Sequence, residues 1–298
     1  MCGLRGLTAG TCCAWPLPLD ASCAKAARRL YRDAAAEVGI TADLIYDGIT
    51  MASELAANTL HAYENFGSRG SLRHHDATLP ELWLYLRGCG TRRELVCKIF
   101  DSYPGWKLGN PPGRNPVRTP AQAVSGRGLQ VVNELSHGRW GHHLTRARLS
   151  VRRVRGKAVW FALPAPAEEP GWGPDGAADD AQADGAVIDC WHQLSARQAM
   201  KKLETMLAAR GLGGRLVRAD RPAVDLSVLW IPHGVTVWCR DGAVSLKTPA
   251  GDSQHWTYAD LVDVTERAVW MHEEMEHSAG PSAPPGPAAP SAPAVSGS

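Results

Sequence analysis

One stretch of the chain has almost nothing to bury, and it divides the sequence into two folding units. Residues 165–186 read APAEEPGWGPDGAADDAQADGA, which is Ala, Gly, Pro and acidic throughout. Because folding must offset lost conformational entropy with apolar burial, such a segment is typical of an interdomain linker. We expect a domain over 20–164 and another over 187–277, with a flexible lead at 1–19 and a disordered Pro/Ala/Ser tail at 278–298.

The first unit begins with helical periodicity and continues with strand-like runs. Ser22 is placed to cap the first helix, and Gly39 is placed to end it. The expected elements are helices at 22–38 and from 41 or 43 to about 63, strands at 81–87 (ELWLYLR) and 94–100 (ELVCKIF), a long Pro/Gly-rich loop at 103–125, a helix opened by Gly126, a strand within 140–154 and a strand at 157–163. This mixture predicts an α+β fold.

The second unit reads as a smaller α+β domain of unknown role. A helix at 195–210 precedes three strands near 226–231, 235–239 and 243–247, and a helix from 258 to about 276 follows. Asp241-Gly242, between the last two of these strands, is a strong signal for a type I′ hairpin turn.

Charge and cysteine usage exclude several functional classes. The formal net charge of +2 gives no broad field for gripping a nucleic-acid backbone, so we expect no nucleic-acid partner. The densest basic run is expected to be a solvated loop or hairpin face; it comprises Arg146, Arg148, Arg152, Arg153, Arg155 and Lys157. No pair among the eight cysteines has metal-binding spacing, and no secretory or membrane-spanning segment is apparent, so we expect a cytoplasmic protein with no membrane partner.

Three short motifs carry residues suited to nucleotide chemistry. Glu54 and Asn58 lie four residues apart on a predicted helix, so both project from one face. Asp101 ends an apolar strand, and Gly105 follows in a D-x-x-x-G pattern that lets the backbone pass close to a flat ligand. The third motif, a G-x-G-L at the predicted start of a helix where free N–H groups favour anions, comprises Gly126, Arg127, Gly128 and Leu129.

Each motif alone is common, but their order is specific. The succession of E-x-x-x-N, D-x-x-x-G, a long loop and G-x-G-L resembles the histidine-kinase-like (GHKL) ATPases over residues 15–164. ELAANTLHA resembles their N box, and FDSYPG and GRGLQVV resemble their two glycine boxes. The closing strands resemble the branch of bacterial anti-sigma-factor serine/threonine kinases. The resemblance implies the Bergerat fold, a two-layer α/β sandwich in which helices cover a mixed sheet.

The resemblance also implies a set of residue roles around ATP and Mg²⁺. Asn58 would ligate Mg²⁺, Asp101 would read the adenine amino group, and Gly105 would flank the base. The two glycines Gly126 and Gly128, with Arg127 and Leu129 beside them, would line the phosphates under a lid at 106–125. Glu54 would be the general base. Two positions depart from the family pattern: His61 stands where a phosphate-contacting Lys is common, and Ala158 where a hydroxyl residue is common.

The function this implies is phosphoryl transfer to a serine or threonine of a protein partner, such as a sigma factor or an anti-anti-sigma-like regulator. The alternative is a nucleotide-dependent partner-binding module with little or no turnover. A homodimer is compatible with either. In the C-terminal unit, HEEMEH puts His272 and His277 five residues apart rather than the four of a zinc-protease helix, so no metal site is expected there.

Overall fold

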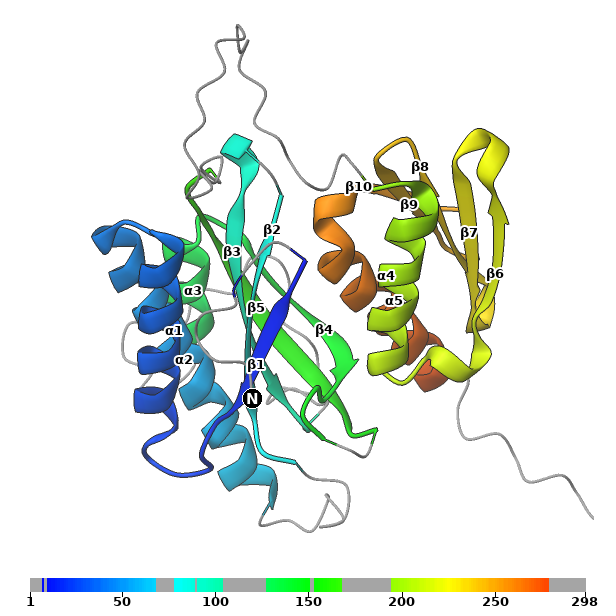
Figure 1. Cartoon of the computed structure of the whole chain (residues 1–298). Coiled ribbons are helices and arrows are strands. Elements are labelled where there is room, and N and C mark those ends of the chain that lie inside the picture. The colour runs from blue at the N-terminus through cyan, green and yellow to red at the C-terminus, as the bar shows by residue number, and fades with distance from the viewer. Residues whose placement is uncertain are drawn as a thin grey trace, which may run out of the picture.

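A computed structural model describes residues 7, 10–67, 78–88, 90–103, 127–150, 153–167 and 194–278. Within these ranges the chain forms five α-helices and ten β-strands, which confirms the α+β class. The elements stack in four layers: three helices, a five-stranded sheet, two helices and a second five-stranded sheet (Figure 1). Gly105, Gly126, the expected lid, most of the expected linker and the C-terminal tail lie outside the described residues.

The first sheet has every neighbouring pair antiparallel. Its strand order is β1 (Cys12–Pro16), β2 (Glu81–Arg87), β3 (Glu94–Asp101), β5 (Arg155–Pro164) and β4 (Trp140–Arg146). The expectation of a mixed sheet is therefore wrong for the described strands. Two consecutive helices connect β1 to β2, and because a short turn joins them they run back and forth, so β2 returns antiparallel to β1.

The segment expected to be a flexible lead contributes an edge strand instead. Cys12–Pro16 pairs with β2 in full register, from Cys12 opposite Tyr85 to Pro16 opposite Glu81. Cys13 and Leu17 are buried in the main core of the N-terminal unit. The strand is short and ends at a proline, so its sequence lacks the alternating run by which strands are recognised.

Three helices cover one face of this sheet: α1 (Cys23–Val38), α2 (Ala42–Gly67) and α3 (Gly128–Leu135). Gly39 ends α1 in the left-handed conformation, at φ 82°, as the sequence predicts. Apolar residues of α1 and α2 meet those of β2, β3 and β5 in one core, which includes Tyr31, Met51, Leu55 and Phe161. The helices therefore hold Glu54 and Asn58 of the first predicted nucleotide motif, and Gly128 and Leu129 of the third, over this face.

The second unit contains the other sheet and the two remaining helices. The antiparallel order is β10 (Ser253–Thr257), β9 (Ala243–Lys247), β8 (Val235–Arg240), β7 (Leu226–Ile231) and β6 (Val217–Arg221). Helices α4 (Ala196–Ala209) and α5 (Leu261–Ser278) pack on it around a separate core. The predicted helices and three predicted strands are present, and β6 and β10 are additional. Asp241 and Gly242 both have positive φ, at 49° and 78°, which fits the predicted I′ turn.

The two helices of the second unit lie between the sheets, so the N-terminal sheet is covered on both faces (Figure 1). Val262 of α5 packs with Tyr85, Val96 and Ala162 on the face opposite α1 and α2. Among the described residues, no helix has both the length and the apolar character needed to cross a bilayer.

Candidate functional site

Three of the predicted nucleotide residues meet where α2 contacts the start of α3. A Cβ built on Gly128 would lie 2.8 Å from Glu54 Oε2 and 3.0 Å from Asn58 Nδ2. Glu54 is half-buried and Asn58 is exposed. The backbone at the first turn of α3 thus reaches the polar ends of both side chains only because residue 128 is glycine. The structure brings Glu54, Asn58 and Gly128 together as the motif order predicts.

Asp101 lies at the end of β3 and is buried, at 3% exposure. Its Oδ1 accepts from Lys157 Nζ at 2.8 Å and from the Tyr103 N–H at 3.0 Å, and Thr59 also hydrogen-bonds to this carboxyl group. Burial raises the pKa of Asp101, while Lys157 and these hydrogen-bond donors oppose the rise. An ionised carboxylate has about four acceptor positions, so three donors still leave room for one amino group.

Lys157 and Thr59 also belong to this candidate site, although neither is part of the three motifs. Thr59 follows Asn58 on α2 and reaches Asp101, so it connects the helix motif to the strand motif. Lys157 stands directly opposite Asp101 in the β3–β5 pairing. The neighbouring Ala158 packs with Trp83 and Phe100 on the other face of the sheet. Residue 158 therefore faces away from Asp101, and Lys157 is the residue of β5 that contacts this carboxylate. The alternation of β5 could have indicated Lys157.

The other predicted site residues are less closely engaged with this cluster. His61 is exposed one turn after Asn58, with Nδ1 3.3 Å from Glu64 Oε2. Arg127 is exposed immediately before α3. Leu129 packs against the core of the N-terminal unit, so it positions α3 rather than offering a polar contact. Gly105 and Gly126 fall outside the described residues.

On the opposite face of the sheet, α5 presents a row of carboxylates to the N-terminal unit. Glu266 accepts from Arg148 Nη2 at 2.6 Å, from Arg210 Nε at 3.0 Å and from Thr145 Oγ1 at 3.3 Å. Burial raises the pKa of Glu266, but the guanidinium groups of Arg210 and Arg148 outweigh it and hold that pKa well below its usual range. The buried carboxylate is thus fully paired across the junction of the two units.

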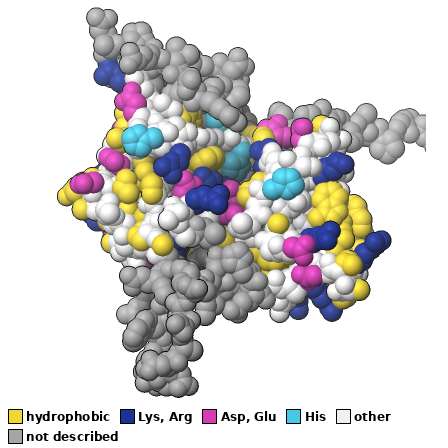
Figure 2. All heavy atoms as spheres, turned by 90° about the horizontal axis from the view of Figure 1, so that it is seen from above, with side chains coloured by type: hydrophobic (Ala, Val, Ile, Leu, Met, Phe, Trp, Pro, Cys, Tyr) yellow, Lys and Arg dark blue, Asp and Glu magenta, His cyan; other side chains and the backbone are white. Residues whose placement is uncertain are grey.

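Further ion pairs extend this junction along the helix. Asp263 accepts from Tyr85 and lies 3.5 Å from Arg87, and Glu273 pairs with Arg146 and Arg155. Arg146 and Arg148 of the basic run thus form ion pairs at this junction, and Lys157 forms one with Asp101 on the other face of the sheet. The expectation of a solvated face is therefore wrong for these three residues. Figure 2 shows basic and acidic side chains gathered along the border between the units.

A cavity of about 620 Å³ opens at the same junction. Tryptophans from both units, basic groups of the first sheet and carboxylates of α5 line it. The tryptophans are Trp140, Trp160, Trp256 and Trp270, and the basic groups include Lys98 and His143. Lys98 Nζ lies 3.3 Å from His143 Nε2, and His143 Nδ1 lies 3.0 Å from the Leu144 carbonyl. Burial lowers the pKa of His143 to about 3, helped by the charge of Lys98. The imidazole is therefore neutral, donating from Nδ1 and accepting from Lys98 at Nε2.

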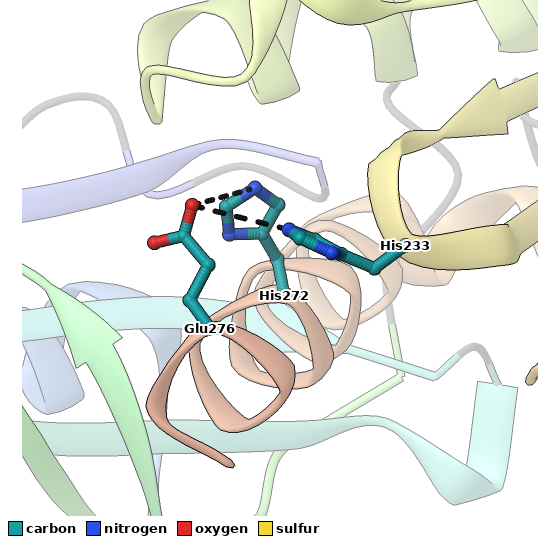
Figure 3. A group of neighbouring side chains, drawn as sticks. All are labelled: His233, His272 and Glu276. Atoms are coloured by element: carbon teal, nitrogen blue, oxygen red, sulfur yellow. Dashed lines mark ion pairs between the residues drawn. The ribbon is translucent and has the colours of Figure 1, made fainter. Parts of the chain in front are cut away.

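Three side chains that could hold a metal ion lie together in the C-terminal unit, where the sequence predicted no metal site. His272 is accompanied not by His277 but by Glu276, one helical turn on, and by His233 from the β7–β8 connection (Figure 3). The side chain of His277 lies outside the described residues. The H-x-x-x-E spacing on α5 could have indicated two of these groups, whereas His233 comes from a distant segment.

No protein-family model matches the chain, and no curated protein sequence matches it.

Proposed function

We propose that the N-terminal unit binds ATP·Mg²⁺ in a histidine-kinase-like fold. The observation that carries the proposal is the approach of Gly128 to Glu54 and Asn58, in which a Cβ would occupy the space next to both polar side chains. A glycine cradle at a helix start beside a carboxylate and an amide suits a phosphate group and its cation. The antiparallel sheet departs from the mixed sheet of the Bergerat expectation.

The order of elements supports the same proposal. The E-x-x-x-N motif lies on α2, Asp101 lies at the end of β3, and Gly128 and Leu129 of the G-x-G-L motif begin α3. Thr59 joins the first two motifs through its hydrogen bond to Asp101. Asn58 would hold Mg²⁺, Asp101 would accept from the adenine amino group, and Gly128 would lie against the phosphates. The cation would neutralise charge on the phosphate oxygens.

For activity, we propose serine/threonine phosphorylation of a protein partner. The hydroxyl oxygen of the partner would form a bond to the γ-phosphorus as the bond to ADP breaks, and Glu54 would accept the hydroxyl proton. Glu54 is half-buried beside Gly128, so it lies next to the proposed phosphate position. If transfer is absent, the same site serves a nucleotide-dependent binding module whose ATP state selects the partner.

Two measurements separate these proposals. In the first, Mg²⁺·ATP should raise the melting temperature of the full chain, because a ligand that binds only the folded state stabilises it. Asn58→Ala and Asp101→Asn should reduce the shift. Absence of any shift with the wild type at millimolar ATP would remove the nucleotide proposal altogether.

In the second, γ-labelled ATP is mixed with the protein and candidate partners. Glu54→Gln should keep the ATP-dependent melting shift but lose transfer by roughly 100-fold or more, as expected on removing a general base. Glu37→Gln, an exposed carboxylate on α1, is the matched control. Nucleotide-dependent partner binding without transfer would favour the binding module, and equal transfer by Glu54→Gln would exclude Glu54 as the base.

A further inference from the structure

His233, His272 and Glu276 direct three metal-binding atoms at one point in the C-terminal unit. His272 Nε2 lies 3.6 Å from Glu276 Oε1, and His233 Nε2 lies 3.9 Å from the same oxygen. All three ligand atoms lie within 4.8 Å of one another. In Figure 3 the two imidazoles and the carboxylate converge from α5 and from the turn beside it.

The backbone places each side chain for this convergence. His272 and Glu276 are four residues apart on α5, so they share one face of the helix. His233 lies in the Pro232–Gly234 turn between β7 and β8, with φ at 66°. A left-handed conformation is uncommon outside glycine, and here it directs the imidazole over α5. The rings of His233 and His272 meet edge to face, with centroids 4.9 Å apart.

The surrounding charges orient the ligands. The two carboxylate oxygens of Glu276 have different neighbours. Oε1 faces the imidazoles, while Oε2 pairs with Arg155 and lies 3.8 Å from Arg146. His272 Nδ1 lies 3.8 Å from Glu273 Oε1 and 3.4 Å from Arg146 Nη2. A metal on Nε2 requires the imidazole proton on Nδ1, so ion binding would turn this N–H from Arg146 toward the Glu273 carboxylate, the usual support of a metal-bound imidazole.

We propose that these three residues bind one divalent ion of the zinc class, with water in a fourth position. Two imidazole nitrogens and one carboxylate oxygen are a donor set that zinc accepts, at about 2.0–2.2 Å from the metal. Ligand atoms at these bond lengths in a tetrahedron are about 3.3 Å apart, so separations of 3.6 Å, 3.9 Å and at most 4.8 Å would close by side-chain rotation as the ion binds. Arg146 and Arg155 oppose the charge of the cation, and Glu273 and Glu276 offset them.

The bound ion would join the β7–β8 turn to α5 close to the arginines of the first sheet. His272 is buried, whereas His233 and Glu276 retain 34% and 24% side-chain exposure, so the site is open to ions from solution. It uses none of the residues assigned to ATP or Mg²⁺, and it stands or falls independently of the nucleotide proposal.

The test uses the full chain, treated with a chelator and then titrated with Zn²⁺ against a chelating indicator, without nucleotide. We expect one ion per chain above the background of the controls, and a Zn²⁺-dependent rise in melting temperature. Substituted Co²⁺ should give the intense visible absorption of a four-coordinate site. His233→Ala, at the half-exposed ligand, should weaken binding by about 100-fold or more, since supporting residues alone contribute 10–100-fold.

His255→Ala is the matched control, because His255 is an exposed histidine of β10 outside the cluster. It should bind Zn²⁺ like the wild type, and every cysteine is retained in both variants. Glu276→Gln provides a second ligand test, at a ligand on α5 rather than in the β7–β8 turn. Equal Zn²⁺ affinity in the wild type, His233→Ala and Glu276→Gln would overturn the proposal and leave the cluster as an ion-pair network only.

Discussion

At the scale of single residues, Gly128 shows how one missing atom defines a site. The atoms nearest to its absent Cβ are the ends of two side chains, Glu54 and Asn58, rather than backbone. Flexible side-chain ends move aside at little cost in folding stability, but they cannot then remain where a ligand requires them. The proposed nucleotide binding is therefore separable from folding at this position.

Gly128→Ala should measurably separate nucleotide affinity from folding stability. We expect the free energy of unfolding to stay within about 1 kcal/mol of the wild type, because the helix preference of alanine offsets the displaced side chains. Affinity for Mg²⁺·ATP, measured by calorimetric titration, should fall at least about tenfold, as expected for about 1.4 kcal/mol of lost binding. Gly214→Ala, at a glycine with open space around it, is the control. Unchanged affinity would contradict the placement of phosphate beside Gly128.

His143 is a second residue whose environment fixes its chemistry. Its pKa in the folded protein is about 3, below the ordinary value of 6.5. Between these values the unfolded chain takes up a proton that the folded chain excludes, so stability is lost as pH falls from 6.5 toward 3. Above pH 6.5 the imidazole is neutral in both states and contributes no pH dependence.

His143→Gln should therefore flatten the pH dependence of stability. Urea unfolding at pH 6.5, 5.5 and 4.5 should show the variant losing about 1.4 kcal/mol less per pH unit than the wild type. His255→Gln, at an exposed histidine, should follow the wild type. Parallel slopes for the wild type and His143→Gln would show that His143 accepts its proton as readily in the folded protein as in the unfolded chain.

At the scale of secondary structure, the sequence predicted elements with an apolar face and missed those without one. The helices α1, α2, α4 and α5 and the buried strands β2, β3 and β5 were predicted nearly to their ends. The missed strands β1, β6 and β10 all lie at sheet edges. Edge strands such as β6 (VRADR) alternate weakly and remain largely exposed, so their pairing depends on the neighbouring strand rather than on their own pattern.

The edge strand β1 leads to a buried anchor, and Leu17 tests its contribution. Leu17 is fully buried after β1, and its N–H donates to the Pro80 carbonyl at 2.7 Å. Leu17→Ala should lower the free energy of unfolding by about 2–5 kcal/mol through lost burial and a cavity. Leu19→Ala, two residues on at 39% exposure, should change it by less than about 0.5 kcal/mol. If chemical denaturation gave similarly small losses of unfolding free energy for both variants, the segment after β1 would not be anchored at Leu17.

Sites assembled from distant elements were likewise predicted only in part. Glu54, Asn58 and Gly128 lie together, as expected from the motif order, whereas the spacing of the motifs alone does not predict that they meet. The ion pair of Asp101 with Lys157 depends on strand register, and His233 reaches α5 only through the packing of two elements. The alternation of β5 and the H-x-x-x-E spacing on α5 indicate some members of these contacts, but no sequence pattern indicates the partners that they meet.

At the scale of the whole molecule, Glu266 connects the two units. It is buried and pairs with Arg148 from the N-terminal unit and Arg210 from the end of α4. The two guanidinium groups also lie over the Trp83 ring, at 5.2 and 5.0 Å. A buried charge that loses its partner keeps its desolvation penalty, so removing the central carboxylate affects both units.

Glu266→Gln preserves shape while removing that charge. We expect the free energy of unfolding to fall by about 3–5 kcal/mol, as for other broken buried pairs. Calorimetry should then resolve separate transitions for the two units. Asp241→Asn makes the same charge change in an exposed pair with Arg240 and should cost at most about 1 kcal/mol. Equal losses in the two variants would show that burial adds nothing to the Glu266 contacts.

The two-sided character of α5 also restricts how this chain can recombine in evolution. One side of the helix completes the core of its own sheet, and the other presents Asp263, Glu266, Glu273 and Glu276 to arginines of the first unit. A gene fusion that exchanged only the C-terminal unit would leave Arg146, Arg148 and Arg155 without these carboxylates. The N-terminal unit and its neighbour are therefore expected to be inherited together, and a substitution in the arginines should be followed by one on α5.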